Sequence, residues 1–578
     1  MNGSETGSGH ASLPLPDRRG RCELAVVLAL GLALGLACRG HFVKPHGDFY
    51  EFREVGRALL RGELPPTFKR APVYPLLVAS LGSVVQVVAE TERPPDQWAA
   101  ELLNALLLPL GAGLCWLLAR GWAGRQAGWV AWWWVLLPVG LYCTAHTLAE
   151  PTLVAAVLAT LVLTQRGSRW AYLLAAVATM TRYDAAGLLL GVAAADLLRG
   201  GRWPRVLARA ALAAAPLLAW LTLTAWTWEQ RSADHYLRQI AQARSVDLRW
   251  PVKVSARMVF DRDAPALPVW AAELEPWLAG GMAAALWAAT ATGAAWLLVR
   301  RRSETAAVGA LLLGYWAVHA VFPFRAGFER FGYPPAAVLL PLAGVGAGLL
   351  GARAVRWKLG LSAAPLSVAG GAVGMLWAGA ETERLWAMWR LGRFADSPLP
   401  TIALTGTVAA WLVISWGWWR VRPRAIAGLL AATMLAGMLG LAAMQTRLAW
   451  QRIGGGDERI NDVLAACWIR DHTRPDEGVL CDAPGLLRLY VPDRDPRLIV
   501  GLGQIAAENW PEILDECRAR QVRYIIWHDQ VFAEQGAYYI AKWRLERFAL
   551  LSQPEQVPGV EVAAHFGGRT SLWILRIK

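Results

Sequence analysis

Long apolar blocks separated by short polar turns dominate the first 450 residues. A membrane-spanning helix needs about 20 consecutive apolar residues, and most of the blocks approach or reach that length. They lie at about 25–38, 98–119, 127–145, 150–164, 170–181, 185–198, 207–228, 278–299, 305–322, 333–351, 361–380, 401–419 and 425–447. This pattern predicts a multi-pass α-helical membrane protein with about 13 transmembrane helices.

The charges of the turns predict the orientation of these helices. With a cytoplasmic N-terminus, the inside segments hold 19 Arg or Lys and only two acids, Asp17 and Glu304. The short outside turns at 146–149, 181–184 and 323–332 hold only three bases, Arg182, Arg325 and Arg330. Because basic residues are retained on the cytoplasmic side, we expect an extracytoplasmic C-terminus.

The remaining segments divide the chain into three parts. Residues 1–22 contain a Gly-, Ser- and Pro-rich stretch and are expected to form a disordered cytoplasmic tail, followed by a transmembrane module at 23–450. Its outside segments at 40–97, 229–277 and 381–400 are too long to be turns, and the first holds an amphipathic stretch, 49–60, and an apolar run, 73–88. We interpret both as juxtamembrane helices.

Residues 451–578 have the pattern of a small extracytoplasmic α/β domain. Strand-like runs occur at 478–481, 497–501, 524–527, 560–564 and 572–577. Helical patterns precede and separate them, beginning near 460 and lying at about 511–520 and 537–550. Alternating strands and helices are typical of this fold class.

Composition supports a membrane protein and argues against a nucleic-acid-binding one. Hydrophobic residues make up 55% of the 578 residues and charged residues only 18%, with a net charge of +14. Residues 451–578 carry 16 basic and 18 acidic residues, so the positive charge belongs to the helical part. The excess therefore reflects membrane topology. The seven cysteines show no paired metal-ligand spacing.

Polar residues beside the outer ends of the predicted helices are the candidates for chemistry, because burying them near a membrane is costly. They lie far apart in the sequence but near one predicted surface: His46, Asp48, Arg70, His146, Glu150, Arg182, Asp184, Arg325, Glu329 and Arg330. Arginine can bind phosphate oxygens through two parallel bonds, and a carboxylate can deprotonate a hydroxyl. The alternative for each residue is that it only pairs with a neighbour at a turn.

The first outer loop resembles that of GT-C glycosyltransferases. Asp48 opens an amphipathic helix that ends near Gly62, and residues 70–75 read Arg-Ala-Pro-Val-Tyr-Pro. The most similar groups are the bacterial relatives of protein O-mannosyltransferases and of the lipid A aminoarabinose transferase, families 39 and 83. The resemblance covers about residues 20–350. Weaker matches lie at 102–105, 149–151, 181–182 and 330–334.

The resemblance implies transfer of a hexosyl or pentosyl unit from a polyprenyl-phosphate donor to an acceptor hydroxyl at the outer face, with inversion. Asp48 would be the general base. Arg70, with Arg330 or Arg182, would bind the donor phosphate. The further candidates for substrate contact are Glu150, Tyr74 and Tyr333. The partners implied are the donor, the hydroxyl acceptor and the bilayer, with no nucleic acid.

Metal dependence stays open at this stage. The aminoarabinose enzymes have an acid just before the basic residue of this loop, used in metal binding, and Lys69 stands there in this sequence. His46 beside Asp48 is the alternative ligand for a divalent ion. Residues 501–506 read Gly-Leu-Gly-Gln-Ile-Ala, a dinucleotide-binding pattern, but no acid follows about 20 residues later. We interpret them as a strand-to-helix turn.

Two other functions are consistent with the same composition. A transporter or flippase of a lipid-linked sugar would be expected to show inverted repeats and Gly- or Pro-broken helices at the midplane, and neither is evident. A non-catalytic membrane protein whose tail binds a partner would not need both Asp48 and Arg70. We therefore expect a glycosyltransferase of a bacterial plasma membrane.

Overall fold

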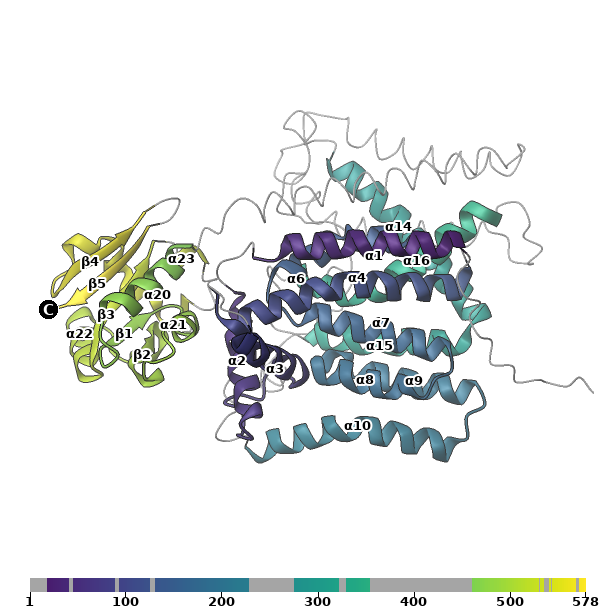
Figure 1. The fold of residues 1–578 in the computed structure, drawn as a ribbon, viewed down its shortest axis with the longest axis horizontal. Helices are drawn as coiled ribbons and strands as arrows, with labels where there is room; N and C mark the ends of the chain where they lie inside the picture. The colour runs from purple at the N-terminus through teal and green to yellow at the C-terminus, as the bar shows by residue number, and fades with distance from the viewer. Residues whose placement is uncertain are drawn as a thin grey trace, which may run out of the picture. The chain divides into compact units, whose positions relative to one another are not determined.

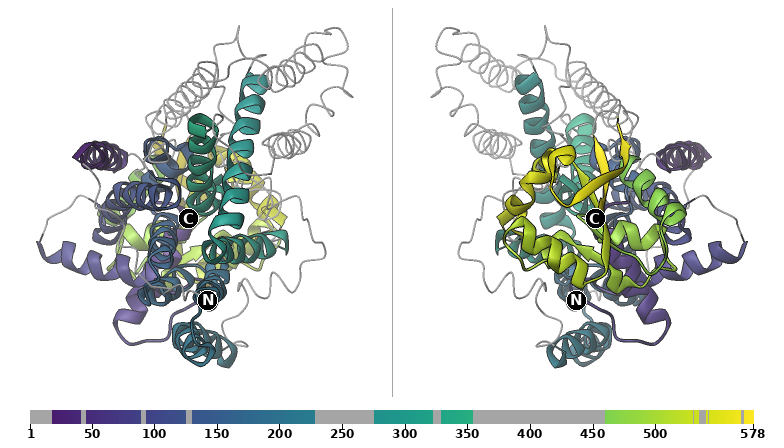
Figure 2. Two further views of the ribbon diagram at one scale, coloured as in Figure 1. Left: turned by 90° about the vertical axis from the view of Figure 1, so that its right-hand side faces the viewer. Right: turned by 90° about the vertical axis from the view of Figure 1, so that its left-hand side faces the viewer.

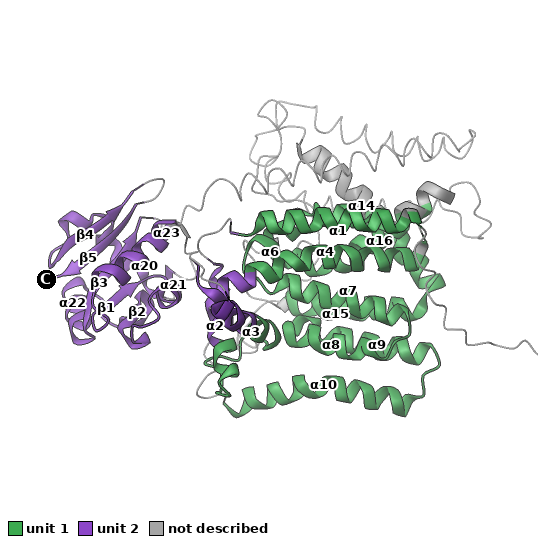
Figure 3. Ribbon diagram, in the orientation of Figure 1, with its two compact units in different colours: residues 1–39, 55–77, 101–452 green, residues 40–54, 78–100, 453–578 purple. Residues whose placement is uncertain are grey.

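The computed structural model describes residues 18–40, 45–88, 93–124, 130–227, 275–321, 329–353, 460–529, 531–534, 540–541, 543–567 and 571–578. The residues divide into two compact units (Figure 3), in which residues 1–39, 55–77 and 101–452 belong to unit 1 and residues 40–54, 78–100 and 453–578 to unit 2. The predicted spans at 361–380, 401–419 and 425–447, the segment 381–400 and Arg325 lie outside the described residues. So do most of the N-terminal tail and nearly all of the segment 229–277.

Described helices of unit 1 lie side by side as a bundle (Figures 1 and 2). The helices of the transmembrane module and its outer loop are α1 (Arg18–Cys38), α2 (Gly47–Leu60), α3 (Val73–Val88), α4 (Pro95–Ala123), α5 (Val130–Val135), α6 (Pro138–Ala145), α7 (Glu150–Gln165), α8 (Trp170–Thr181), α9 (Gly187–Leu198), α10 (Trp203–Trp226), α14 (Glu275–Arg300), α15 (Arg302–Val321) and α16 (Tyr333–Arg353). The 3₁₀ turns η2 (Tyr183–Ala185) and η4 (Glu329–Gly332) interrupt this series.

Most predicted apolar blocks in the described part coincide with these helices. The exception is the block at 127–145, which forms two short helices, α5 and α6. Pro138 is the first residue of α6, and a proline lacks the N–H that a continuous helix needs. By length and composition, three described helices can cross a membrane: Gly20–Cys38 of α1, Pro95–Trp122 of α4, and α10.

Small residues allow neighbouring helices of the bundle to approach closely. A Cβ on Gly293 of α14 would lie 2.0 Å from the Leu342 carbonyl oxygen of α16, and one on Gly187 would lie 2.3 Å from that of Ala310. Membrane helices characteristically pack through such residues. The close contacts fix α14 against α16 and α9 against α15, and they hold the turns at the helix ends in place.

Unit 2 contains the C-terminal α/β domain. The sheet has the order β2-β1-β3-β5-β4, with β2, β1 and β3 parallel and β5 antiparallel to β3 and β4. Its elements are α20 (Ile460–His472), β1 (Gly478–Cys481), α21 (Pro484–Tyr490), η5 (Pro496–Leu498), β2 (Ile499–Gly501), η6 (Leu502–Gln504), α22 (Trp510–Ala519), β3 (Val522–His528), α23 (Val531–Glu534), η7 (Leu545–Ser552), η8 (Pro554–Gln556), β4 (Val560–Phe566) and β5 (Leu572–Ile577).

Burial explains the strands of this sheet. Central β3 is buried at six of its seven residues, whereas the edge strand β4 is mostly exposed. The Gly-x-Gly segment ends β2 and enters the 3₁₀ turn η6, where the Gln504 Oε1 atom accepts the Gly501 N–H at 2.8 Å. Since no α-helix begins at η6, the segment lacks the helix N-terminus of a dinucleotide site.

Candidate functional site

Three helix ends supply the charged residues at one end of the bundle. Glu150 is the first residue of α7, where Pro151 favours the helix start. Arg182 follows α8 in extended conformation, with φ of −152°, and leads into η2. Arg330 lies in η4, just before α16. The turns between these helices thus carry the polar residues that the sequence placed at the outer surface.

The Arg182 guanidinium bridges two carboxylates. Its Nη1 donates to Glu150 Oε1 at 2.5 Å and its Nη2 to Asp184 Oδ2 at 2.7 Å. The Arg330 Nε lies 3.7 Å from the same Glu150 oxygen. The Glu150 side chain is 2% exposed and that of Asp184 5%, so these charges are compensated inside the protein. We call Glu150, Arg182, Asp184 and Arg330 the charge cluster.

Aromatic residues and a histidine complete the surroundings of the charge cluster. His319 Nε2 of α15 lies 3.5 Å from Asp184 Oδ2, and the Tyr315 hydroxyl donates to the Phe331 carbonyl at 2.5 Å. Burial alone would raise the pKa of Asp184, but the adjacent Arg182 and His319 outweigh it and lower the pKa to about 2. Asp184 therefore stays ionised.

Sequence reasoning missed His319 and Tyr315, which lie within a predicted span. His319 could have been found from the sequence, because it is an ionisable residue inside an apolar helix. Such a residue is by default a candidate for a functional site.

Tyr74 connects the Arg-x-Pro-x-Tyr-Pro motif with the charge cluster. Its side chain is buried, and it interacts with Glu150 and Asn104. The Asn104 Nδ2 donates to the carbonyl oxygens of His146 at 2.8 Å and Leu148 at 3.1 Å. These bonds fix the turn before α7 and thereby the position of Glu150.

A hydrogen-bonded contact holds the loop that carries Arg70. The Tyr183 hydroxyl donates to the Phe68 carbonyl at 2.9 Å and accepts the Trp220 Nε1–H at 2.7 Å. The Phe68 ring meets the Trp220 ring edge-on at 5.0 Å. Arg70 follows two residues later and is 6% exposed. The loop is therefore fixed on η2 and α10, beside the turn that supplies Arg182.

Tyr333 has a different environment from the other candidates. It begins α16, its ring lies 5.4 Å from that of Trp134, and it contacts the backbone at Gly140. A role in substrate contact stays a prediction for this residue.

Asp48 belongs to unit 2, where it lies in the first turn of α2. Its N–H donates to His46 Nδ1 at 3.2 Å, and its Oδ2 lies 4.0 Å from the same nitrogen. The Nδ1 atom of His46 thus accepts a hydrogen bond from the N-terminus of α2. It is also the histidine nitrogen that lies near the Asp48 carboxylate. In the described part of the chain, no three His, Cys, Asp or Glu side chains gather as metal ligands. Within the described residues, His46 and Asp48 therefore offer at most two ligands, and the Nδ1 atom of His46 already accepts the Asp48 N–H.

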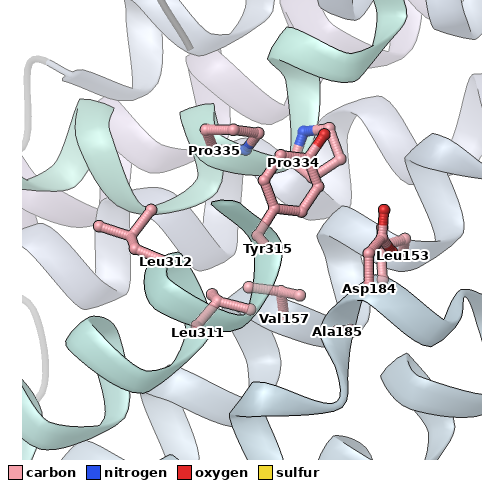
Figure 4. Close-up of a pocket in the computed structure, with 9 residues that line it drawn as sticks. All are labelled: Leu153, Val157, Asp184, Ala185, Leu311, Leu312, Tyr315, Pro334 and Pro335. Carbon is pink, nitrogen blue, oxygen red and sulfur yellow. The ribbon is translucent and has the colours of Figure 1, made fainter. Parts of the chain in front are cut away.

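A small cavity adjoins the charge cluster (Figure 4). Asp184 and Tyr315 line it together with apolar residues of α7, α15 and α16, among them Leu153, Leu311 and Pro334. It has room for about one water molecule. A sugar does not fit there, so the cavity does not serve as the substrate site in this conformation.

Comparison with known proteins places the fold. No protein-family model and no curated protein matches the sequence. Among solved structures, apo ArnT from Cupriavidus metallidurans matches with 16% identity and a TM-score of 0.51, covering 96% of this chain and 98% of that one.

ArnT from Cupriavidus metallidurans bound to undecaprenyl phosphate matches over the same shares, with 14% identity and a TM-score of 0.50. The Archaeoglobus fulgidus oligosaccharyltransferase has 12% identity and a TM-score of 0.48, covering 91% of this chain and 71% of that one. ArnT is the lipid A aminoarabinose transferase. The chain therefore shares the fold of the two ArnT structures, as the loop around Asp48 and Arg70 indicated.

Proposed function

We propose that the chain is a glycosyltransferase that moves a sugar from a polyprenyl-phosphate donor to an acceptor hydroxyl at the outer face of a bacterial plasma membrane. The fold similarity to ArnT spans nearly the whole chain, and one of those ArnT structures holds undecaprenyl phosphate. The observation that carries the proposal is the burial and fixation of Arg70, two residues after the Phe68 carbonyl that Tyr183 binds.

Arg70 is the arginine that the Arg-x-Pro-x-Tyr-Pro motif assigns to the donor phosphate. Arg182 already bridges Glu150 and Asp184, and Arg330 lies against Glu150. Their charges are compensated by carboxylates, so an added phosphate would compete with strong buried pairs. Arg70 would bind the phosphate and stabilise the negative charge that grows as the sugar leaves. Arg182 and Arg330 then contribute mainly by shaping the surroundings.

Asp48 would act as the general base. A carboxylate within hydrogen-bond reach of the acceptor can take the hydroxyl proton while the oxygen attacks the anomeric carbon from the face opposite the phosphate. The expected result is inversion at that carbon. The proposal requires Asp48 and Arg70 to face the same bound substrate pair.

Two variants with matched controls test these roles. Asp48→Asn should abolish transfer while expression and membrane insertion persist, whereas Glu51→Gln, on the same helix, should retain it. Arg70→Ala should weaken use of the donor far more than Arg61→Ala, because the Arg61 side chain is 60% exposed and pairs with the similarly exposed Glu63. Normal transfer by Asp48→Asn would exclude Asp48 as the base.

The substrates can be identified without assuming them. Mass spectrometry of glycolipids and glycans from cells with and without the chain should reveal one sugar modification that depends on it. Native mass spectrometry of the purified protein should detect a bound polyprenyl phosphate, and Arg70→Ala should reduce its occupancy. A lipid-linked sugar that accumulates on one side, with no modified product, would instead favour a flippase.

A further inference from the structure

The C-terminal α/β domain makes a close contact with the half of α2 that carries Asp48, and both belong to unit 2. Gly485, the second residue of α21, faces Tyr50 of α2. A Cβ at Gly485 would lie 2.5 Å from Tyr50 Cγ, closer than real atoms approach. Only a glycine permits this approach between α21 and α2 without displacing one of them.

An ion pair extends the contact along both helices. Arg488 Nη1 donates to Glu54 Oε1 at 3.2 Å. Arg488 lies three residues after Gly485, and Glu54 lies four residues after Tyr50, so each pair of residues shares one helix face. The two helices thus meet at two points, which restricts both sliding and rotation. We call these four residues the α2–α21 contact.

The element that holds α2 is itself rigid. Leu486, Leu487, Leu489 and Tyr490 of α21 are buried. The helix follows β1 directly, and its start is fixed by Asp482, whose Oδ2 lies 3.1 Å from His528 Nε2 at the end of β3. The position of α21 is therefore set by the central strands of the sheet.

A second set of contacts holds a neighbouring face of α2. Arg53 Nε donates to Asp96 Oδ2 at 3.0 Å, and the Asp96 side chain is 2% exposed. A Cβ on Gly82 of α3 would lie 2.0 Å from Asp96 Oδ1, so α3 and the start of α4 pack closely there. The first half of α2 is consequently fixed by this pair as well as by α21.

We propose that the C-terminal α/β domain positions the general base, with Gly485 and Arg488 as positioning residues that act through Tyr50 and Glu54. This inference rests on the proposed function, in which Asp48 is the base. Asp48 precedes Tyr50 by two residues and shares its helix, so any displacement of α2 moves the carboxylate. A misplacement of about 1 Å can cost about 100-fold in rate.

Gly485→Ala tests the inference, with Gly503→Ala as the matched control. At Gly503, a Cβ would lie 2.7 Å from Trp543 Cδ1, within the same domain but away from α2. Both variants should strain the domain, but only Gly485→Ala should lower kcat, by tenfold or more, with the KM for the donor unchanged. Equal kcat values for the two variants would overturn the positioning role.

Hydrogen exchange of the full-length protein in detergent provides a readout independent of activity. Gly485→Ala should speed exchange of the amides of residues 47–54, and Gly503→Ala should not. Unchanged exchange there would overturn the inference, even if activity falls. Faster exchange with unaltered transfer would show that the contact orders α2 without setting catalysis, and would also overturn the positioning role.

A charge exchange provides a second test. Glu54→Arg should lower kcat by placing two guanidinium groups together, and adding Arg488→Glu should restore much of it by reversing the pair. Absence of rescue would count against the ion pair. Failure of the proposed function would give a different result. Asp48→Asn would then retain transfer, while the hydrogen-exchange experiment would still report on the α2–α21 contact.

Discussion

The two ends of the helical bundle in unit 1 differ in the burial of most of their arginines. At the end where α7 begins, Arg182 and Arg330 lie against buried carboxylates, with side chains 20% and 9% exposed. At the end where α7 stops, Arg166, Arg169 and Arg202 are exposed, and Arg209 of α10 is 44% exposed beside Asp196. About 24 Å of helix separates the two ends of α7.

The difference indicates what each end requires. Exposed arginines cost little and fix the orientation of the chain relative to the membrane. Buried arginines must be compensated, because removal of one partner leaves an uncompensated charge in a medium of low polarity. The charge cluster is therefore expected to be sensitive to single substitutions, and the exposed arginines at the other end to be tolerant of them. Arg199 differs from those exposed arginines, because it lies 3.4 Å from the buried carboxylate of Glu304.

The predicted topology places the two ends of the bundle on opposite sides of the membrane, so a test of their orientation has only two outcomes. We expect a reporter fused after Lys578 to be active only outside the cytoplasm. In a chain whose exposed Cys22 and partly exposed Cys467 are replaced by serine, Trp170→Cys at the arginine-rich end, where the side chain is 58% exposed, should react only with a thiol reagent applied from the cytoplasm. Labelling from outside, or a cytoplasmic reporter signal, would refute the 13-span topology.

Arg182→Leu should produce the largest loss of stability. It removes the guanidinium that bridges the buried Glu150 and Asp184 and leaves the longer contacts to Arg330 and His319, at a cost of roughly 3–5 kcal/mol in the free energy of unfolding. Arg209→Leu is the matched control at the other end, where an exposed pair contributes less than about 1 kcal/mol. Denaturant titration of the purified proteins in detergent measures both values. Equal losses would show that the two ends do not differ.

The arrangement of helices was largely accessible from the sequence. The predicted span at 170–181 coincides with α8, and the apolar run at 73–88 coincides with α3. An apolar block bounded by proline or charged residues has few alternatives to a helix of that length. The break between α5 and α6 depends on the single residue Pro138. The predicted helix at about 537–550 is described mainly as the 3₁₀ helix η7, since hydrophobic periodicity does not separate the two helix types.

The candidate site was accessible only in part. Turn residues such as Glu150, Arg182 and Arg330 could be assigned to one surface, because each follows or precedes an apolar block. Their partners could not be assigned, since pairing depends on which helices are neighbours. His319 meets Asp184 from 135 residues away in sequence, and Tyr183 binds a backbone carbonyl, which leaves no signature in the side chain of Phe68.

Acid should weaken the charge cluster through Asp184. Its pKa of about 2 lies below the value of about 3.9 in an unfolded chain. The stabilisation is therefore complete above about pH 5 and is lost as the pH falls towards 2, a change of about 2 kcal/mol. The advantage of the wild type over Asp184→Asn should shrink over that range in thermal unfolding.

Tyr183→Phe should have the smallest effect on stability and the most specific one on donor binding. The substitution keeps the ring and removes the hydroxyl that joins Trp220 to the Phe68 carbonyl, at a cost of about 1 kcal/mol. Because Arg70 follows Phe68 by two residues, we expect the KM for the donor to rise about fivefold, which corresponds to that energy.

Tyr172→Phe is the matched control for this effect. Its hydroxyl donates to Asp196 at 3.1 Å from the first turn of α8, whereas Tyr183 lies in η2, just beyond the other end of that helix. Loss of this bond should lower stability by a similar amount and leave the donor KM unchanged. If both variants raise the donor KM equally, the effect reflects general loosening of α8, and Tyr183 has no separate part in positioning Arg70.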